Sequence, residues 1–195
     1  MTRVLVVPRT ALGPLPERGA WAMTDSPDSP DGLPGLWLER DRAETDENFL
    51  QIIPYALLRD ASGQLWCYER LGGDARVRYC RSCGVGGHVD EAGQADGLLA
   101  TAAVALRREL AEELVWTPDR DRLHPAAWLY EGESAIGRVH LGLIYTLDWD
   151  SHEPPTPAPG EPLGPLGFLT ATAIVADDRL ELWSRLAAGW AAARS

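Results

Sequence analysis

Two neighbouring stretches decide how this chain folds: Gly84-Val-Gly-Gly-His-Val-Asp-Glu-Ala-Gly93 and, shortly after it, Arg108-Glu-Leu-Ala-Glu-Glu113. The first stretch is rich in glycine, which lets backbone atoms approach a ligand closely. The second lies in a segment, residues 98–114, whose apolar residues recur with the period of an α-helix. Their order predicts a glycine-rich turn that leads into a helix.

The predicted helix has an apolar face and an adjoining acidic face. The residues expected to face the core are Leu99, Ala103, Leu106, Leu110 and Leu114. Glu109, Glu112 and Glu113 fall within about 100° of one another on the helix. Like charges at this spacing destabilise a helix by a few tenths of a kcal/mol each. A bound divalent cation would explain the cluster, because Mg²⁺ prefers carboxylate oxygens; a solvated acidic face is the alternative.

Strands are expected on both sides of this helix. Their ranges are 2–8, 51–59, 64–70, 77–80, 126–130 and 138–147. The second and third should form a hairpin, because a short polar turn, Asp60–Gly63, joins them. Further helices are expected near 42–47 and, as an amphipathic helix, over 178–193. This arrangement predicts an α/β (α+β) fold, an α/β/α sandwich around a mixed β-sheet.

The 195 residues suit a single domain, with a loop-rich N-terminal extension over about 1–48 and a Pro-rich loop over 150–165. No apolar run approaches the roughly 18 residues that a membrane span needs, so we expect a cytoplasmic protein with no membrane partner. The net charge of -11 disfavours a long nucleic-acid partner. A small nucleotide bound with Mg²⁺ is compatible with it. All 18 basic residues are arginines, which excludes lysine chemistry.

The three cysteines are Cys67, Cys80 and Cys83. The last two have the spacing of a metal knuckle, but no second pair accompanies them. We therefore expect buried free thiols rather than a zinc site, and no stoichiometric zinc in the purified protein.

The glycine-rich loop followed by Arg-Glu-Leu-Ala-Glu-Glu resembles the Nudix box. That box is a glycine, five residues, Glu, seven residues, and then Arg-Glu-(aliphatic)-x-Glu-Glu-x-Gly-(aliphatic). The resemblance is strongest over 86–116 and extends over roughly 50–150. The Nudix hydrolase family is thus the family that this chain resembles.

The chain departs from the box at two points. About seven extra residues separate Gly87 from Arg108, so the first acid of the box has no direct equivalent. Asp90, Glu91 and Asp96 are the candidates to replace it, and the sequence does not choose among them. Val115 stands where the box has its last glycine, which normally helps to end the helix.

The resemblance implies a metal site on the helix. Glu109, Glu112 and Glu113 should hold Mg²⁺, or Mn²⁺, with help from a backbone carbonyl around Gly87. Arg108 lies one turn before Glu112 and could fix a carboxylate through a charge-assisted hydrogen bond. Glu113, Glu112 and Arg108 are therefore the expected catalytic residues.

The general base is left open between Glu113 and two loop carboxylates, Glu131 and Glu133. For these two, a solvent-facing hairpin loop is the simpler interpretation. His88 adjoins the glycines, and a structural role is commoner for a lone histidine than a role in binding. His88, Glu131 and Glu133 are nevertheless the candidate substrate-binding residues.

The implied function is hydrolysis of a phosphoanhydride or phosphoester bond by a metal-activated water. The substrate would be a nucleoside diphosphate derivative or a related small phosphate compound. The longer loop resembles a Nudix subgroup labelled phosphoesterases, although a label is not an activity. The alternatives are a catalytically silent nucleotide sensor and a non-catalytic acidic metal-binding domain. Homodimers are common in the family, so a homodimer is one further expectation.

Overall fold

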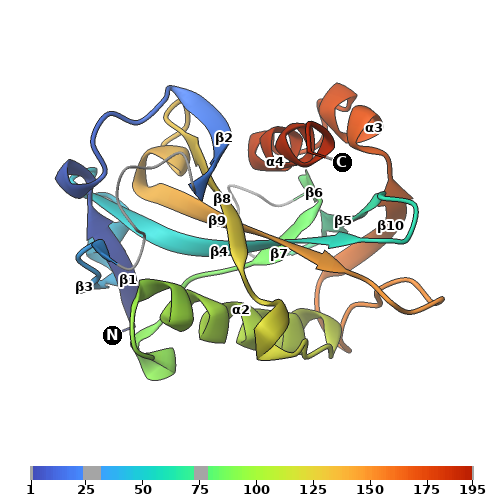
Figure 1. Ribbon diagram of the computed structural model, residues 1–195, viewed down its shortest axis with the longest axis horizontal. Coiled ribbons are helices and arrows are strands. Elements are labelled where there is room, and N and C mark those ends of the chain that lie inside the picture. Colours follow the sequence, from blue (N-terminus) through green and yellow to red (C-terminus); the bar gives the residue numbers. More distant parts are fainter. Residues whose placement is uncertain (1, 24–31, 73–78, 195) are drawn as a thin grey trace.

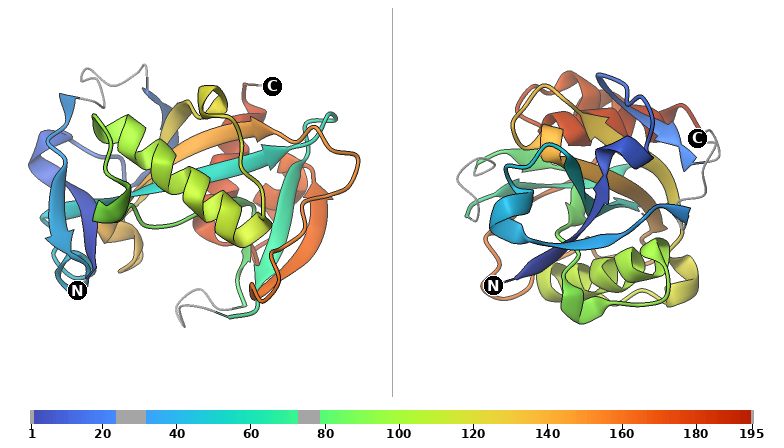
Figure 2. Two further views of the ribbon diagram at one scale, coloured as in Figure 1. Left: turned by 90° about the horizontal axis from the view of Figure 1, so that it is seen from below. Right: turned by 90° about the vertical axis from the view of Figure 1, so that its left-hand side faces the viewer.

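A mixed β-sheet lies between two layers of helices in the part of the chain that the computed structural model describes, residues 2–23, 32–72 and 79–194. Helix α2 (Leu98–Leu114) covers one face, and α3 (Ala171–Ala176) and α4 (Leu182–Ala192) cover the other (Figure 1). The right-hand view of Figure 2 shows these three layers edge-on. The expected α/β/α sandwich is therefore confirmed. No helix among the described residues is long and apolar enough to cross a membrane.

Two parallel strands form the centre of the sheet. β4 (Phe49–Arg59) pairs with β9 (His140–Asp148), with Gln51 opposite His140. Residues 50–58 of β4 are all buried, as expected for a strand that is covered on both faces. On one side of this pair, β4 is followed by β5 (Leu65–Arg70) and then β10 (Leu163–Leu169). On the other side, β9 is followed by β8 (Pro125–Glu131) and then β2 (Arg18–Ala22). The strand order is thus β10-β5-β4-β9-β8-β2.

The N-terminal part of the chain contributes to the same sheet. β1 (Arg3–Pro8) pairs antiparallel with β4 and with β3 (Leu36–Glu39). Of the expected loop-rich extension, residues 24–31 lie outside the described residues, as do residues 77 and 78 of one expected strand. Tyr79 and Cys80 are not in a strand; β6 (Arg81–Ser82) follows them, and then β7 (Gly84–Gly86), which pairs with β4.

Short helical segments connect these elements. They are η1 (Arg9–Ala11), α1 (Arg40–Ala43), η4 (Glu91–Gly93), η5 (Arg120–Arg122) and η6 (Gly137–Val139). The segment η4 lies within the extra residues between the glycine-rich turn and α2.

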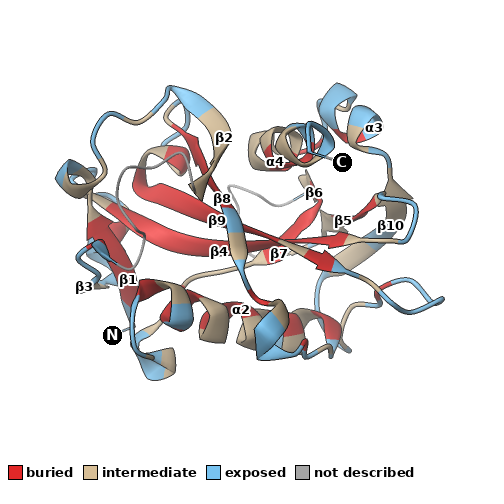
Figure 3. Ribbon diagram, in the orientation of Figure 1, coloured by how far each residue is buried: buried red, intermediate tan, exposed pale blue. Residues whose placement is uncertain are grey.

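Helix α2 spans the predicted residues, but its buried face is rotated from the predicted one. The buried residues are Leu98, Thr101, Ala102, Ala105, Leu106, Leu110 and Leu114. Leu99 and Ala103 are only partly buried and flank this face. The small side chains of Ala102 and Ala105 allow the helix to lie against the sheet, so the line of closest approach runs through them. Figure 3 shows the buried strands and the partly exposed outer face of α2.

The C-terminal expectations were wrong in detail. β10 begins at Leu163, inside the expected loop, and α4 begins at Leu182 rather than at residue 178. Proline and glycine suggested a loop, but proline is tolerated in strands at sheet edges and at bulges. β10 lies at the edge of the sheet, and its register shifts between Pro165 and Gly167.

Candidate active site

The glycine-rich turn brings the backbone against the acidic face of α2. A Cβ atom at Gly87 would lie 2.7 Å from Cδ of Glu109, and one at Gly86 would lie 1.8 Å from the Pro54 carbonyl oxygen. Any larger residue would separate the turn from the helix or from β4. The glycines are therefore required for this close approach.

Arg108 ties the turn to the helix. Its guanidinium donates to the His88 carbonyl at 2.9 Å, to Oε1 of Glu109 at 2.6 Å, and to the Asp90 carboxylate. The carboxylate that it holds is thus Glu109, whereas the sequence suggested Glu112. The reason is that the loop folds back over the helix and presents Asp90 on the other side of the guanidinium.

Asp90 is the loop acid that reaches the helix site. Its ion pair with Arg108 places it near Glu109, where its charge adds to the burial that raises the pKa of Glu109. Glu91 instead pairs with Arg3 at 2.9 Å on the exposed surface, and Asp96 is exposed. Of the three acids that the sequence left open, Asp90 alone contacts the machinery on α2 in the described residues.

Glu113 is the most unusual carboxylate of the site. Its Oε2 atom is buried and has no hydrogen-bond partner among the described residues. Burial raises the pKa of Glu113 to about 7; the charges of Glu109 and Glu112 act in the same direction, whereas Arg70 opposes them. A carboxylate in this environment is poised for a proton or a cation.

Burial also raises the pKa of Glu109, although Arg108 lowers it. Glu112, by contrast, is exposed. The three carboxylates offer oxygen donors only, which suits a hard divalent cation such as Mg²⁺ or Mn²⁺. The unpartnered oxygen of Glu113 and the contact of Glu109 with Gly87 both fit such an ion.

A cavity of about 600 Å³ opens beside the glycine-rich turn. Its wall includes Gly87, His88, Arg70 and Glu131, and Trp183 of α4 lies on the same wall. Gly87 therefore borders both the cavity and Glu109. Arg70 ends β5, and its charge acts on Glu113. Arg70 could not be singled out from the sequence, because a charged residue at a strand end is common.

The two loop carboxylates have different environments. Glu131 is buried and accepts hydrogen bonds from the backbone N–H groups of Glu133 and Ser134 at 2.8 and 2.9 Å, and from the Ser134 hydroxyl. The solvent-facing interpretation is therefore wrong for Glu131, because its carboxylate closes the loop. Glu133 is exposed, as the solvent-facing interpretation expected, and pairs with Arg18 at 2.8 Å.

The cysteines are free thiols. Cys67 and Cys83 are buried, and Cys80 is partly buried. Burial raises the pKa of Cys67 to about 12 and also raises that of Cys83. In the described part of the chain, no cluster of three metal-ligating side chains includes a cysteine.

Comparison with known proteins supports the assignment of the fold. The crystal structure of Tm1382, a protein assigned to the Nudix hydrolases, superposes with a TM-score of 0.72 over 96% of this chain and 97% of Tm1382, at 23% identity. DR0079 from Deinococcus radiodurans gives a TM-score of 0.49 over 82% of this chain and 87% of DR0079, at 24% identity. The superposition on Tm1382 shows that the chain has the Nudix fold.

The sequence comparisons are more limited. The chain is 31% identical to Protein YmaB of Bacillus subtilis (strain 168) over 113 residues, which are 56% of this chain. The match spans about half of YmaB, 54% of its length. No protein-family profile matches the chain.

Proposed function

We propose that this chain is a Nudix-type hydrolase that cleaves a phosphoanhydride or phosphoester bond. The substrate class is a nucleoside diphosphate derivative or a related small phosphate compound. The observation that carries the proposal is that Oε2 of Glu113 is buried and has no hydrogen-bond partner among the described residues. Glu113 lies on the same helix as Glu109 and Glu112, and the charge of Arg70 lowers its pKa. A purely structural carboxylate would be hydrogen-bonded in such a position.

Glu109, Glu112 and Glu113, with a backbone carbonyl around Gly87, are the residues that would hold Mg²⁺ or Mn²⁺. When bound, such an ion lowers the pKa of a water molecule and neutralises the oxygens around the attacked phosphorus. Asp90 takes the place of the missing first acid of the box through its ion pair with Arg108.

The residues of the chain have separable roles. Glu113 is the proposed general base, because its Oε2 has no hydrogen-bond partner among the described residues and burial raises its pKa in the metal-free protein. Arg108 positions Glu109 and fixes the turn at His88. Arg70 supplies positive charge at the cavity wall, where the phosphate groups would bind. Glu131 is a poor base, since the adjoining loop donates hydrogen bonds to both of its oxygens.

His88 and Glu133 lie on the wall of the same cavity and are the residues placed to contact the rest of the substrate. The net charge of -11 fits a small substrate bound with a metal better than a long nucleic acid. A cytoplasmic location and a homodimer stay predictions.

The test is a turnover screen of nucleoside diphosphate derivatives and simple phosphate esters with Mg²⁺ or Mn²⁺, with nucleotide binding measured in parallel. Glu112→Gln keeps the shape of the side chain and removes its charge. We expect turnover to fall roughly 10²–10⁴-fold, with an equal or slightly higher melting temperature in EDTA, because one of three crowded charges is removed.

Glu153→Gln is the matched control, since Glu153 is exposed in a loop outside the site; its turnover should equal that of the wild type. Nucleotide binding without turnover of any compound would favour the silent sensor. Unchanged turnover together with a lowered melting temperature in Glu112→Gln would mean that the acidic cluster is structural.

A further inference from the structure

Three metal-ligating side chains from distant parts of the sequence converge at the cavity beside the glycine-rich turn. They are Glu44, which follows α1, His88, which follows β7, and His140, the first residue of β9. One ligand atom from each lies within 4.8 Å of the other two. The Nε2 atoms of the two histidines are 3.3 Å apart, and Nε2 of His88 lies 3.5 Å from Oε1 of Glu44.

The protonation of His140 follows from its surroundings. Its Nδ1 atom lies 2.7 Å from the carbonyl oxygen of Ile136. A carbonyl oxygen only accepts hydrogen bonds, so Nδ1 carries a proton and Nε2 of the neutral ring keeps its lone pair. That lone pair is on the side of His88 and Glu44. A backbone carbonyl that fixes the tautomer in this way is typical of a metal-bound histidine.

The spacing of the donor atoms fits a tetrahedral ion. With bonds of about 2.0–2.2 Å, two ligands of a tetrahedral Zn²⁺ lie roughly 3.3–3.5 Å apart. Two of the three separations, 3.3 and 3.5 Å, match that edge length, and the ligand atoms of the third pair, Glu44 and His140, lie within 4.8 Å of each other. The distance of 3.3 Å also suits a hydrogen bond between the two histidine rings. A metal titration distinguishes that hydrogen bond from a metal site.

Burial and access are also suitable. His140 is buried, and the side chains of His88 and Glu44 are 23% and 18% exposed. Both histidines line the cavity of about 600 Å³, so a fourth ligand position can open toward solvent or substrate. Arg40 lies 3.8 Å from Glu44 and is also on the cavity wall.

We propose that Glu44, His88 and His140 bind a transition metal of the zinc type, at a site separate from the glutamates of α2. Two imidazoles and one carboxylate suit Zn²⁺ or Co²⁺ better than Mg²⁺. The backbone of His88 bonds to Arg108 while its ring contacts His140, so this residue connects the two sites. The expectation of no zinc rested on the cysteines alone, and these three ligands form no recognisable sequence motif.

The test uses the full chain without a histidine tag. Zn²⁺ is titrated calorimetrically in excess Mg²⁺, and Co²⁺ serves as an absorption probe of coordination geometry. We expect one Zn²⁺ per chain and the intense visible bands of tetrahedral Co²⁺. Glu44→Gln and His88→Gln should each weaken Zn²⁺ binding more than about 100-fold, whereas His152→Gln, an exposed loop histidine, should bind like the wild type.

Glu112→Gln should also keep the Zn²⁺ site, which makes the result independent of the hydrolase proposal. Circular dichroism establishes that each variant is folded, and Glu44→Gln removes the ligand on a short connecting segment if a histidine variant fails to fold. Equal Zn²⁺ affinity in His88→Gln, Glu44→Gln and His152→Gln would overturn the proposal. So would imidazole NMR signals of His88 and His140 that are unmoved by one equivalent of Zn²⁺.

Discussion

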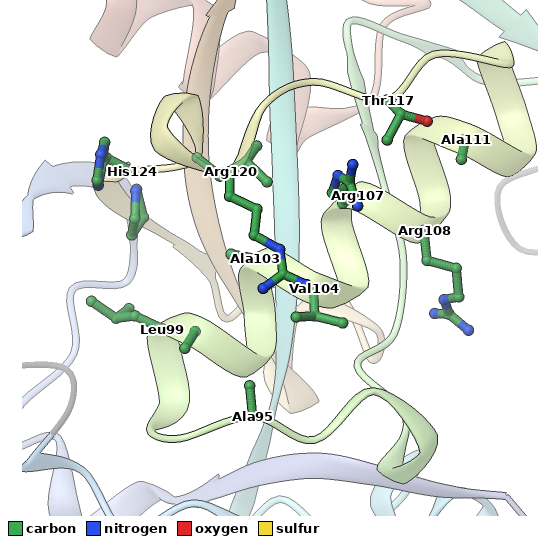
Figure 4. A pocket seen from close by; sticks show the side chains of 13 residues that line it. Ala95, Leu99, Ala103, Val104, Arg107, Arg108, Ala111, Thr117, Arg120 and His124 are labelled. Carbon is green, nitrogen blue, oxygen red and sulfur yellow. The ribbon is translucent and has the colours of Figure 1, made fainter.

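Arg107 and Arg108 are consecutive on α2 and both line a cavity on the outer side of the helix, but Arg108 also reaches the glycine-rich turn. Arg108 contacts Asp90, Glu109 and the glycine-rich turn. Arg107 donates to the Pro118 carbonyl at 3.1 Å and, with Arg120, lines a cavity of about 670 Å³ on the outer side of the helix (Figure 4).

The outer cavity is the larger of the two, but its described lining is mostly small and apolar and includes no carboxylate. The region around Glu113 holds the buried oxygen without a partner and the carboxylates whose pKa burial raises. The comparison shows that the candidate site is identified by buried charged groups that lack hydrogen-bond partners or have shifted pKa values. The volume of a cavity does not identify it.

The variant with the largest expected effect is Glu113→Gln, which tests whether the region around Glu113 is the active site. The variant removes the proposed base while keeping the shape of the side chain, so we expect turnover to fall roughly 10²–10⁴-fold. The measurement is the initial rate with Mg²⁺ on whichever compound the screen identifies. Glu153→Gln again serves as the control, and a Glu113→Gln variant as active as this control would exclude Glu113 as the base.

A second effect concerns stability against pH in the metal-free protein. The Glu113 carboxyl titrates at about 7 in the folded chain and near 4.5 in the unfolded chain, so the unfolded state releases its proton first. The ionised, buried form therefore lowers the free energy of unfolding as pH rises from about 4.5 to 7, by at most about 3 kcal/mol. Below that window this loss is absent.

Urea unfolding in EDTA at several pH values measures this effect as the difference between wild type and Glu113→Gln. The difference should grow through the window in favour of the variant and then level off. A difference that is constant with pH would show that Glu113 has an ordinary pKa.

Variants of the two consecutive arginines, Arg107 and Arg108, compare the two sides of α2 directly. Arg108→Gln should lower metal affinity or turnover roughly 10–100-fold, because it frees Glu109 and the turn. Arg107→Gln should leave both nearly unchanged, since its contact is with a loop carbonyl on the other side. Mn²⁺ titration and initial rates measure the two variants side by side. Equal losses in both would mean that the helix as a whole, and not the contacts of Arg108, supports the site.

The smallest predicted effect is at the end of α2. Val115 has a left-handed conformation, with φ of 52° and ψ of 30°, where the box has glycine. Val115→Gly should raise the free energy of unfolding by about 1 kcal/mol, because the Cβ atom disfavours this conformation. Val104→Gly, within the helix, should lower it. Urea unfolding of both variants tests the opposite signs; a loss in both would mean that Val115 is not strained.

Part of the fold could be predicted from the periodicity of apolar residues in the sequence. The bounds of α2 and the β4–β5 hairpin follow from local patterns of apolar residues and turns. β10 could not be found in this way, because its sequence is rich in glycine and proline and it gains its structure from pairing with β5. α3 was also missed, because it is only six residues long and packs against α4. In the N-terminal part, β1 lies within the predicted range 2–8, whereas β2 and β3 were missed and depend on partners far along the chain, β8 and β1.

The candidate site was predictable where it lies on one helix. Glu109, Glu112 and Glu113 share a local pattern, and Asp90 was one of three candidate acids that its contact with Arg108 then separated from the others. Arg70 and Glu44 gain significance only through contacts that the sequence does not contain. The orientation of Arg108 toward Glu109 depended on the path of the loop through Asp90. The buried state of Glu131 depended on its hydrogen bonds to the following loop. The spacing of residues along one helix identifies the candidate ligands on that helix. Which residues of other elements lie beside them depends on the long-range contacts of the fold.

The parallel pairing of β4 with β9 sets an order of events during folding. Residues 51–59 cannot meet residues 140–148 until the chain between them has been made and has closed a long loop. Such non-local contacts slow folding, because the entropy of loop closure is lost before the contact forms. The β4–β5 hairpin and α2 can form early from local contacts. His140, at the start of β9, arrives with the last central strand, so the cavity beside the glycine-rich turn is completed late.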